Sequence, residues 1–316
     1  MRIALTDKCN LRCFYCMPAE GIPFMPKAEM MTYEEILRLA KIVAEQGVSK
    51  IRLTGGEPFL RKDIMPFLEE MCAIAGIEEV HITTNGTLIH KHMAKLKSLK
   101  IRSINLSIDS VDRARFHEIT RRDNLHLVME AMDLILENEI ALKLNMVVMQ
   151  GKNIQDIIPM VELAKEKNLN VRFIEEMPFN GNSEQGNPSF YSHQDILNHI
   201  AHIYPQFSKL DSGPYSTSTN YKIEGFKGSF GIIAAFSRTF CGTCNRLRLT
   251  AQGTIKTCLY DDGIFNIKDL MRKGKNDAEI LNALERAVGA RSKDGFEAAA
   301  KRKNSSVSES MATIGG

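Results

Sequence analysis

The sequence lacks most features that would assign it to a simple class of protein. No apolar run in its 316 residues approaches the roughly 20 needed to cross a bilayer, and no apolar signal segment follows Met1. Lys and Arg exceed Asp and Glu only by 41 to 38, too small an excess to indicate nucleic acid without a clustered basic face. No G-x4-G-K-[ST] loop occurs, so side chains would have to hold any polyphosphate. We expect a cytoplasmic protein that binds neither membrane nor nucleic acid.

Cysteine is also scarce, and its seven copies are unevenly spread. In a reducing compartment, clustered cysteines bind metal or react more often than they form disulfides. The eight histidines show no ligand spacing that would complete a metal site. Six of the seven cysteines form two groups of three, which are Cys9, Cys13 and Cys16 near the start and Cys241, Cys244 and Cys258 near the end.

Short β-rich runs alternate with helical patterns about every 30 residues, which is the size of a βα unit. This alternation predicts an α/β fold, a partial (βα)6 TIM-type barrel over residues 1–179. In such a barrel the chemistry lies at the carboxyl ends of the strands. The predicted strands are residues 2–6, 50–54, 79–84, 103–109, 141–148 and 171–176, and the predicted helices are residues 32–47, 64–75, 90–99, 125–138 and 154–166.

The pattern changes after about residue 179. Asn, Gly, Ser and Pro are frequent up to residue 192, and a predicted helix at 194–203 and short strands around 229–235 follow. We predict a C-terminal α+β domain over residues 180–316 that closes the mouth of the barrel. From about residue 290 the composition alone predicts a mobile tail.

Three closely spaced thiols suit an iron–sulfur cluster better than zinc. Structural zinc takes four ligands, whereas three cysteines on a 4Fe–4S cube leave one iron open to another ligand. The spacing Cys9-x3-Cys13-x2-Cys16 therefore predicts such a cluster on the loop after the first strand. The alternative is a zinc site completed by a distant histidine, His81 or His117.

A second cluster is predicted by Cys241-x2-Cys244-x13-Cys258, with an incomplete zinc ribbon as the alternative. Arg246 and Arg248 follow at alternate positions, so in an extended segment both guanidinium groups face the same way. Forked guanidiniums are preferred partners of phosphate oxygens. The alternative is two solvated arginines on an edge strand.

The motifs CNLRCFYC (residues 9–16) and TGGEP (residues 54–58) resemble those of the radical S-adenosylmethionine (SAM) superfamily. The resemblance implies that the open iron binds SAM, and that the reduced cluster cleaves it to methionine and a 5′-deoxyadenosyl radical that abstracts hydrogen from a substrate. Glycines in TGGEP would let backbone carbonyls approach the SAM ammonium, and Glu57 could accept from it. The SAM contacts implied by the resemblance are Tyr15, Gly56, Glu57, Thr83, Ser107, Lys143 and Met177.

The whole chain resembles the GTP 3′,8-cyclase (MoaA) family of molybdenum cofactor biosynthesis. The resemblance rests on RIALTDKCNLRCFYCMP, KIRLTGGEPFLRKDI, ITTNG, INLSIDS, RFIEEM, FCGTCNRLRL and the terminal Gly315-Gly316. It implies that GTP is converted to (8S)-3′,8-cyclo-7,8-dihydroguanosine 5′-triphosphate, with guanine on the second cluster and the glycine tail entering the active site. The implied GTP contacts are Arg2, Lys50, Arg52, Arg172, Arg246 and Arg248, and the implied catalytic group is Arg2, Arg246, Arg248, Gly315 and Gly316.

The same resemblance implies a set of partners. They are a flavodoxin- or ferredoxin-type electron donor, a downstream cyclic pyranopterin monophosphate synthase and a second copy of the chain in a homodimer. Two other functions stay open: a radical SAM peptide-modifying enzyme with an auxiliary cluster, and a non-enzymatic iron–sulfur or zinc scaffold. The first would use more cysteines than the three near the C-terminus, and the second would need neither TGGEP nor a barrel.

Overall fold

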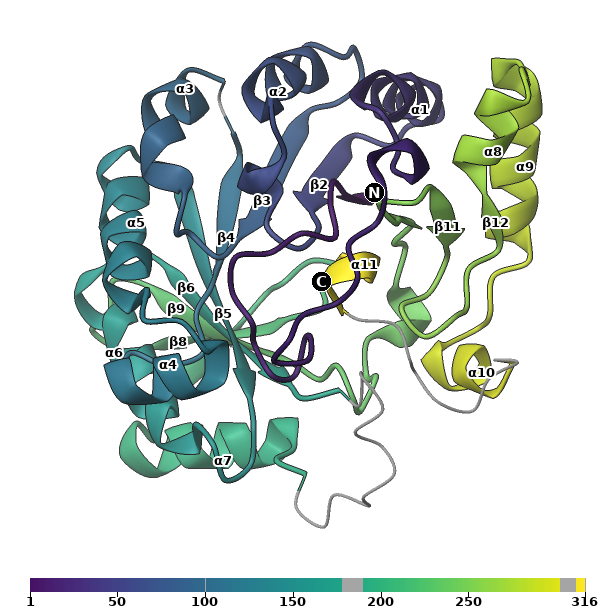
Figure 1. Cartoon of the computed structure of the whole chain (residues 1–316). Coiled ribbons are helices and arrows are strands. Elements are labelled where there is room, and N and C mark those ends of the chain that lie inside the picture. Colours follow the sequence, from purple (N-terminus) through teal and green to yellow (C-terminus); the bar gives the residue numbers. More distant parts are fainter. Residues whose placement is uncertain (100, 178–189, 302–310, 316) are drawn as a thin grey trace.

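The computed structural model describes residues 1–99, 101–177, 190–301 and 311–315. Its first half contains the six expected strands, which pair in chain order as parallel neighbours. Helices α1 to α6 surround this curved sheet on its outer side, so the predicted partial (βα)6 barrel is confirmed (Figure 1). The elements are β1 Arg2–Ala4, α1 Tyr33–Glu45, β2 Lys50–Thr54, α2 Ile64–Cys72, β3 Glu79–Thr84, α3 Met93–Ser98, β4 Ser103–Ser107, α4 Arg113–Thr120, α5 Leu125–Glu137, β5 Ala141–Val148, α6 Ile157–Glu166 and β6 Asn170–Glu175.

Local sequence explains why these elements form where they do. Thr32 and Glu35 make the capping box expected at the start of α1, since each side chain bonds the other's backbone N–H. Helix α4 was not predicted, because its sequence RARFHEIT has a weak apolar stripe and buries only Phe116, Ile119 and Thr120. Asp112 caps it by accepting from the backbone N–H of Arg115 at 2.9 Å.

The C-terminal part continues the same sheet at both edges. Strand β9 pairs in parallel with β6, and β10 pairs in parallel with β1. The connection between β9 and β10 therefore runs from one edge of the sheet to the other, and it carries Cys241 and Cys244. The elements are α7 His193–Ile203, β7 Phe207–Leu210, β8 Thr219–Ile223, β9 Ser229–Ile233, β10 Arg248–Leu249, β11 Thr254–Lys256, β12 Phe265–Asn266, α8 Ile267–Arg272, α9 Asp277–Gly289, α10 Gly295–Ala300 and α11 Met311–Ile314.

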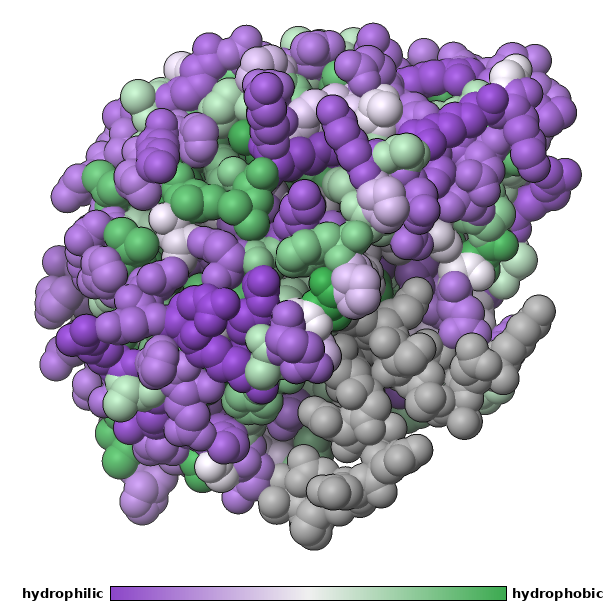
Figure 2. Space-filling model, in the orientation of Figure 1, coloured by the Kyte–Doolittle hydropathy of each residue, from purple (hydrophilic) through white to green (hydrophobic). Residues whose placement is uncertain are grey.

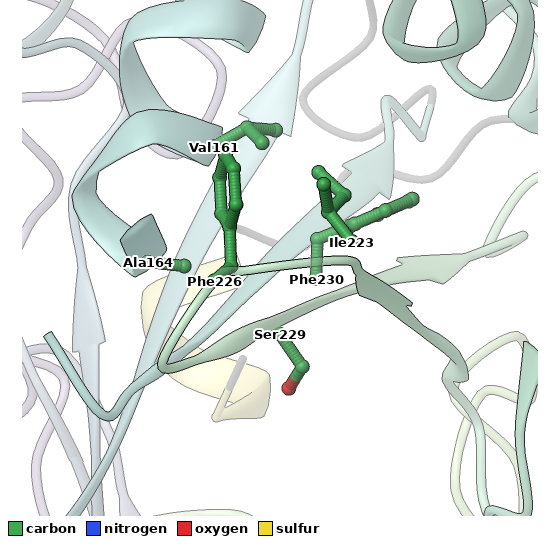
Figure 3. A pocket seen from close by; sticks show the side chains of 6 residues that line it. All are labelled: Val161, Ala164, Ile223, Phe226, Ser229 and Phe230. Atoms are coloured by element: carbon green, nitrogen blue, oxygen red, sulfur yellow. The ribbon is translucent and has the colours of Figure 1, made fainter. Parts of the chain in front are cut away.

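Apolar packing joins the two parts of the chain. Figure 3 shows Val161 and Ala164 of α6 beside Ile223, Phe226 and Phe230 from the β8–β9 hairpin. Four of these five side chains, all except Val161, are between 1% and 8% exposed, and Val161 is fully buried. Such burial stabilises the fold by about 25 cal/mol for each Å² of apolar surface, so the hairpin is held firmly against the barrel.

The end of the chain differs from the mobile tail that its composition predicts. Within the described ranges, α10 and α11 are helical, and α11 buries Ala312 and Ile314. Figure 1 places α11 over the middle of the curved sheet. The expectation of a mobile tail was wrong for these segments. In α11, three apolar residues, Met311, Ala312 and Ile314, are at least partly removed from water, which favours an ordered helix. No helix among the described residues is long and apolar enough to cross a bilayer.

Candidate active site

A cavity of about 940 Å³ runs along the inner face of the barrel strands and reaches their carboxyl ends. Its wall combines the inner face of the sheet with the loops that carry both groups of cysteines. The sequence-predicted residues that line it are Cys9, Cys13, Cys16, Cys241, Cys244, Cys258, Arg2, Lys50, Arg52, Arg172, Arg246, Arg248, Tyr15, Gly56, Thr83, Ser107, Lys143 and Met177. The structure thus brings together both halves of the expected site.

The first cysteine loop is held against the last turn of α4. The backbone N–H of Arg12 donates to the carbonyl of Thr120 at 2.9 Å, and that of Phe14 donates to Ile119 at 3.1 Å. Arg121, in the left-handed backbone region, donates from its guanidinium to the carbonyls of Arg12 and Met17. An unpredicted helix therefore shapes the segment that presents three thiols to the cavity.

These thiols fit an iron–sulfur cluster. All seven cysteines are free, and the amide of Asn85 donates to Cys9 Sγ at 3.7 Å, which would help to stabilise a thiolate there. Burial raises the pKa of Cys13, and Asp109 and the neighbouring thiols raise it further, so a positive group such as iron is needed to keep that sulfur ionised. Three thiolates and the space beside them suit a cluster with one open iron.

The TGGEP turn packs directly on the first cysteine loop. A Cβ on Gly56 would lie 2.2 Å from the carbonyl oxygen of Lys8, so no larger residue fits. Glu57 is fully buried and does not line the cavity. It accepts hydrogen bonds from the hydroxyl of Thr84 at 2.8 Å and from the backbone N–H groups of Asn85 at 2.7 Å and Phe59 at 3.1 Å. In this structure Glu57 therefore stabilises the turn.

Three other expected SAM contacts, Thr83, Ser107 and Lys143, lie on the inner face of neighbouring strands. Thr83 and Lys143 flank Asn105 in one register row, and Ser107 pairs with Asn145 in the next. Burial and the charges of Arg172 and Arg52 together lower the pKa of Lys143 to about 8. A bound carboxylate would raise this pKa again and stabilise the charged ammonium.

Arginines gather on the same inner face. Arg248, Arg2 and Arg52 are register partners across β10, β1 and β2, so their side chains point the same way. Arg172 comes from β6, and Arg246 precedes β10. Because β10 lies between β1 and β11 and Arg248 is 7% exposed, the solvated edge-strand alternative was wrong for this residue.

The described part of the chain gives these arginines no counter-ion, because none of its carboxylates lies at ion-pair distance from any of the five. Burial, with the charges of Arg248 and Arg52, lowers the pKa of Arg2 well below its ordinary range. Burial and the charge of Arg246 lower the pKa of Arg52 and of Arg248 to about 10. A cavity with so much uncompensated positive charge requires a polyanionic ligand. Lys50 differs, since it is exposed at the rim and pairs with Glu79 at 3.3 Å.

The second group of cysteines lines the same cavity as the first. Arg246 donates to Cys244 Sγ at 3.5 Å. Burial alone would raise the pKa of Cys244, but the backbone N–H and the charge of Arg246 together lower it. Cys258 accepts from the backbone N–H of Tyr260 at 3.5 Å. This set of three thiols with N–H donors also suits an iron–sulfur cluster.

The end of the described tail reaches the arginine row. Arg248 donates to the carbonyl of Gly315 at 2.8 Å. Gly315 has a φ of 79°, and a Cβ there would lie 2.9 Å from side-chain atoms of Ala4 and Thr54. Gly315 therefore lies where the sequence resemblance implied, and Gly316 lies outside the described residues.

The zinc alternatives find no support in the described part of the chain. No three His, Cys, Asp or Glu side chains converge there on a point that one metal ion could occupy. His81 bonds Ser103 at 2.7 Å and Glu79 at 2.9 Å, and burial and Arg52 lower its pKa. His117 lies on α4 and is absent from the cavity wall.

Some cavity residues were missed from sequence. Asn105 and Asn145 line the cavity, and within the described ranges their buried Oδ1 atoms have no hydrogen-bond partner. Asp109 was expected from sequence at the end of the fourth strand but without a role; it accepts from the Tyr15 hydroxyl at 2.7 Å, and burial raises its pKa to about 6. The sequence could have indicated that these residues face the cavity, because polar residues at alternate positions of a predicted buried strand face one side.

Comparisons with known proteins agree with this geometry. The model of the radical SAM superfamily matches residues 3–164, and that of molybdenum cofactor synthesis C matches residues 169–297. SuiB of Streptococcus suis, solved with S-adenosylmethionine, superposes with a TM-score of 0.61 at 16% identity over 85% of this chain and 64% of SuiB. That likeness concerns the fold alone, and fold and first motif together define a radical SAM protein.

Proteins of similar sequence identify the family within this superfamily. Molybdenum cofactor biosynthesis protein moc-5 of Caenorhabditis elegans is 44% identical over 289 residues, which cover 91% of this chain and 48% of that protein. GTP 3′,8-cyclase of Moorella thermoacetica is 39% identical over 289 residues, which cover 91% of this chain and 89% of that protein. The chain spans about half the length of the animal relatives it matches. It belongs to the radical SAM superfamily and, within it, to the family of molybdenum cofactor biosynthesis protein 1 and GTP 3′,8-cyclase.

Proposed function

We propose that this chain is a radical SAM GTP 3′,8-cyclase, which forms (8S)-3′,8-cyclo-7,8-dihydroguanosine 5′-triphosphate in the first step of molybdenum cofactor biosynthesis. The observation that carries the proposal is the group of five arginines without counter-ions, in a cavity bounded by two three-cysteine loops. A triphosphate offers the charge that these guanidiniums require. The similarity to GTP 3′,8-cyclase of Moorella thermoacetica supports the same substrate.

On one side of the cavity, Cys9, Cys13 and Cys16 would hold a 4Fe–4S cluster. Such a cluster would supply the electron for cleavage of SAM, and the resulting radical would remove the C3′ hydrogen of GTP. Gly56 keeps the turn free of side chains so that backbone groups can reach SAM. The remaining SAM contacts would be Tyr15, Thr83, Ser107, Lys143 and Met177, while Glu57 holds the turn from behind.

On the other side, Cys241, Cys244 and Cys258 would hold a second 4Fe–4S cluster beside the guanine. The arginines on the inner face would bind the triphosphate, and Lys50 would contact it only at the rim. Arg248 is held by the carbonyl of Gly315, so the tail would control the orientation of this guanidinium. Arg2, Arg246, Arg248, Gly315 and Gly316 are the residues we propose for catalysis.

The rival functions fit less well. SuiB bound to its precursor peptide superposes with a TM-score of 0.57, but at 15% identity this likeness concerns the fold and not the substrate. A peptide backbone is uncharged and would leave the arginines of the cavity wall uncompensated. A non-enzymatic scaffold would not need a cavity of about 940 Å³ lined by both cysteine loops.

The wider setting follows from the same family. We propose a barrel domain over residues 1–179, a C-terminal domain over 180–316, a cytoplasmic location and a homodimer. A flavodoxin- or ferredoxin-type protein would deliver electrons, and a cyclic pyranopterin monophosphate synthase would take the product.

Two cysteine variants test whether the two cysteine groups have the separate functions proposed for them. Cys13→Ala should abolish SAM cleavage, because it removes a ligand of the cluster that binds SAM. Cys241→Ala should leave some uncoupled cleavage of SAM but lose the cyclised nucleotide. Both are measured by anaerobic chromatography of deoxyadenosine and nucleotide products after reconstitution. Retained cyclisation in Cys241→Ala would refute the second site, and full deoxyadenosine production in Cys13→Ala would refute the first.

A further inference from the structure

Basic side chains surround the first cysteine loop on its outer side. Lys8 Nζ lies 6.0 Å and Arg12 Cζ lies 5.8 Å from the centre of the Phe24 ring, which is 40% exposed. Arg121 bonds the carbonyl of Arg12, and Arg122 is the exposed residue next to it. These four cations, Lys8, Arg12, Arg121 and Arg122, are called the basic collar below.

Figure 2 shows hydrophilic residues gathered over α4. Acidic residues of this face are already paired with other cations. Asp123 pairs with Arg113, Asp156 with Arg115 at 2.6 Å, and Glu118 with Lys152 at 2.8 Å. Among the residues that the structure describes, no carboxylate pairs with a member of the collar. Glu20, exposed in the same loop, reduces the positive charge but does not cancel it.

The collar has no task inside the cavity. Lys8 and Arg122 are exposed and do not line it, whereas Cys9, Cys13 and Cys16 do. Lys8 directly precedes Cys9 in the chain, and Arg12 directly precedes Cys13. A redox group held by these thiols would therefore lie close to the collar. An exposed, unpaired positive surface attracts an acidic partner and orients it during encounter.

We propose that the basic collar docks an acidic one-electron carrier protein, which reduces the cluster held by Cys9, Cys13 and Cys16. In this step the carrier loses one electron and the cluster gains one, with no transfer of atoms. The inference rests on the proposed function, because it assumes that the first cysteine loop holds a reducible cluster. It adds the place of contact and the charge of the partner. Phe24 would supply an apolar contact at the centre of the charged patch.

The test uses the reconstituted full-length protein and a purified bacterial flavodoxin in reduced form. Cluster reduction is followed by anaerobic stopped-flow absorbance, and the dissociation constant for oxidised flavodoxin is measured by titration at several salt concentrations. The variant is Lys8→Glu with Arg122→Glu, since both side chains are exposed and neither touches the cavity. The matched control is Lys209→Glu, an equally exposed lysine on the edge strand β7.

We expect reduction by flavodoxin to slow by roughly tenfold in the double variant, and the affinity to weaken and lose salt dependence. The control, the iron content and reduction by dithionite should be unchanged, because dithionite needs no docking surface. If the rate of reduction by dithionite also falls in the double variant, the neutral double variant Lys8→Gln and Arg122→Gln is measured in its place. It should be reduced more slowly by flavodoxin but at the wild-type rate by dithionite.

Three results would overturn the proposal. They are an unchanged flavodoxin rate in both double variants, an equal loss in Lys209→Glu, and equal affinity of the collar for a short DNA duplex in competition with flavodoxin. Failure of the proposed function has a different signature. In that case wild-type protein reduced with dithionite makes no cyclised nucleotide. The affinity for flavodoxin, compared between wild type and the double variant, still tests the collar separately.

Discussion

Gly56 lies where the backbone leaves no room for a side chain. Its missing Cβ would lie 2.2 Å from the Lys8 carbonyl, and backbone cannot yield as a flexible side chain can. Gly56→Ala should therefore lower the free energy of unfolding by about 1–3 kcal/mol and weaken SAM binding. Gly289→Ala is the control, since nothing lies within 4 Å of a Cβ there. Thermal unfolding and SAM titration measure both effects, and a Gly56→Ala protein equal to the control would contradict the close approach.

Arg52 illustrates how a binding site can weaken the fold that holds it. It lies half-buried beside Arg2 and Arg246 without a carboxylate partner in the described ranges, and its pKa is lowered to about 10. Arg52→Met should therefore raise the melting temperature of the ligand-free protein by about 2–4 °C for each kcal/mol of relieved repulsion. The same variant should show a smaller stabilisation by GTP, which in wild type is about 2.7 kcal/mol at a hundredfold excess over Kd.

Scanning calorimetry with and without GTP measures both halves of this prediction. Arg113→Met is the control, because Arg113 is exposed and pairs with Asp123 on the surface, so it should shift neither value. A lower melting temperature for ligand-free Arg52→Met would show that the arginine contributes more to packing than it loses by repulsion.

Among the secondary-structure elements, α4 positions the first cysteine loop, although its sequence did not predict a helix. Its last turn receives the backbone N–H groups of Arg12 and Phe14, and Arg121 reaches back to the carbonyls of Arg12 and Met17. Arg121→Asn keeps a residue that tolerates the observed φ of 55° but removes those contacts. Hydrogen exchange at the amides of Arg12 and Phe14 should then quicken on the order of tenfold.

The control for this element is Arg122→Asn, which leaves the contacts to the loop in place. Exchange is measured by mass spectrometry or NMR on the iron-free protein, so the result does not depend on activity. Unchanged exchange in Arg121→Asn would mean that the backbone bonds alone hold the loop on α4.

The strands were easier to predict than the helix that shapes the site. Periods of two and 3.6 in the sequence identified all six barrel strands, with β1 and β4 two residues shorter than expected. Thiol spacing placed the two cysteine groups, because their chemistry is local. Sequence could not show that Glu57 turns away from the cavity or that Gly315 meets Arg248, since both depend on contacts between residues far apart in the chain.

Across the whole molecule, the chain closes its own cavity from both edges of the sheet and with its tail. Strands β9 and β10 flank the barrel, and the described tail ends against Arg248. Removing Gly315 and Gly316 should leave GTP binding within about twofold, because the other arginines stay in place, but it should stop turnover. Calorimetric titration and product chromatography measure these separately, and unchanged turnover would mean that the tail only fills space.

The central claim is that one cavity brings SAM and GTP together so that a radical made from one takes hydrogen from the other. The most direct test is an anaerobic reaction of the reconstituted, reduced protein with SAM and with GTP deuterated at C3′. Mass spectrometry then reads the isotope content of the deoxyadenosine. The account predicts one deuterium in deoxyadenosine together with a cyclised nucleotide. Deoxyadenosine without deuterium, formed while SAM is cleaved, would contradict it.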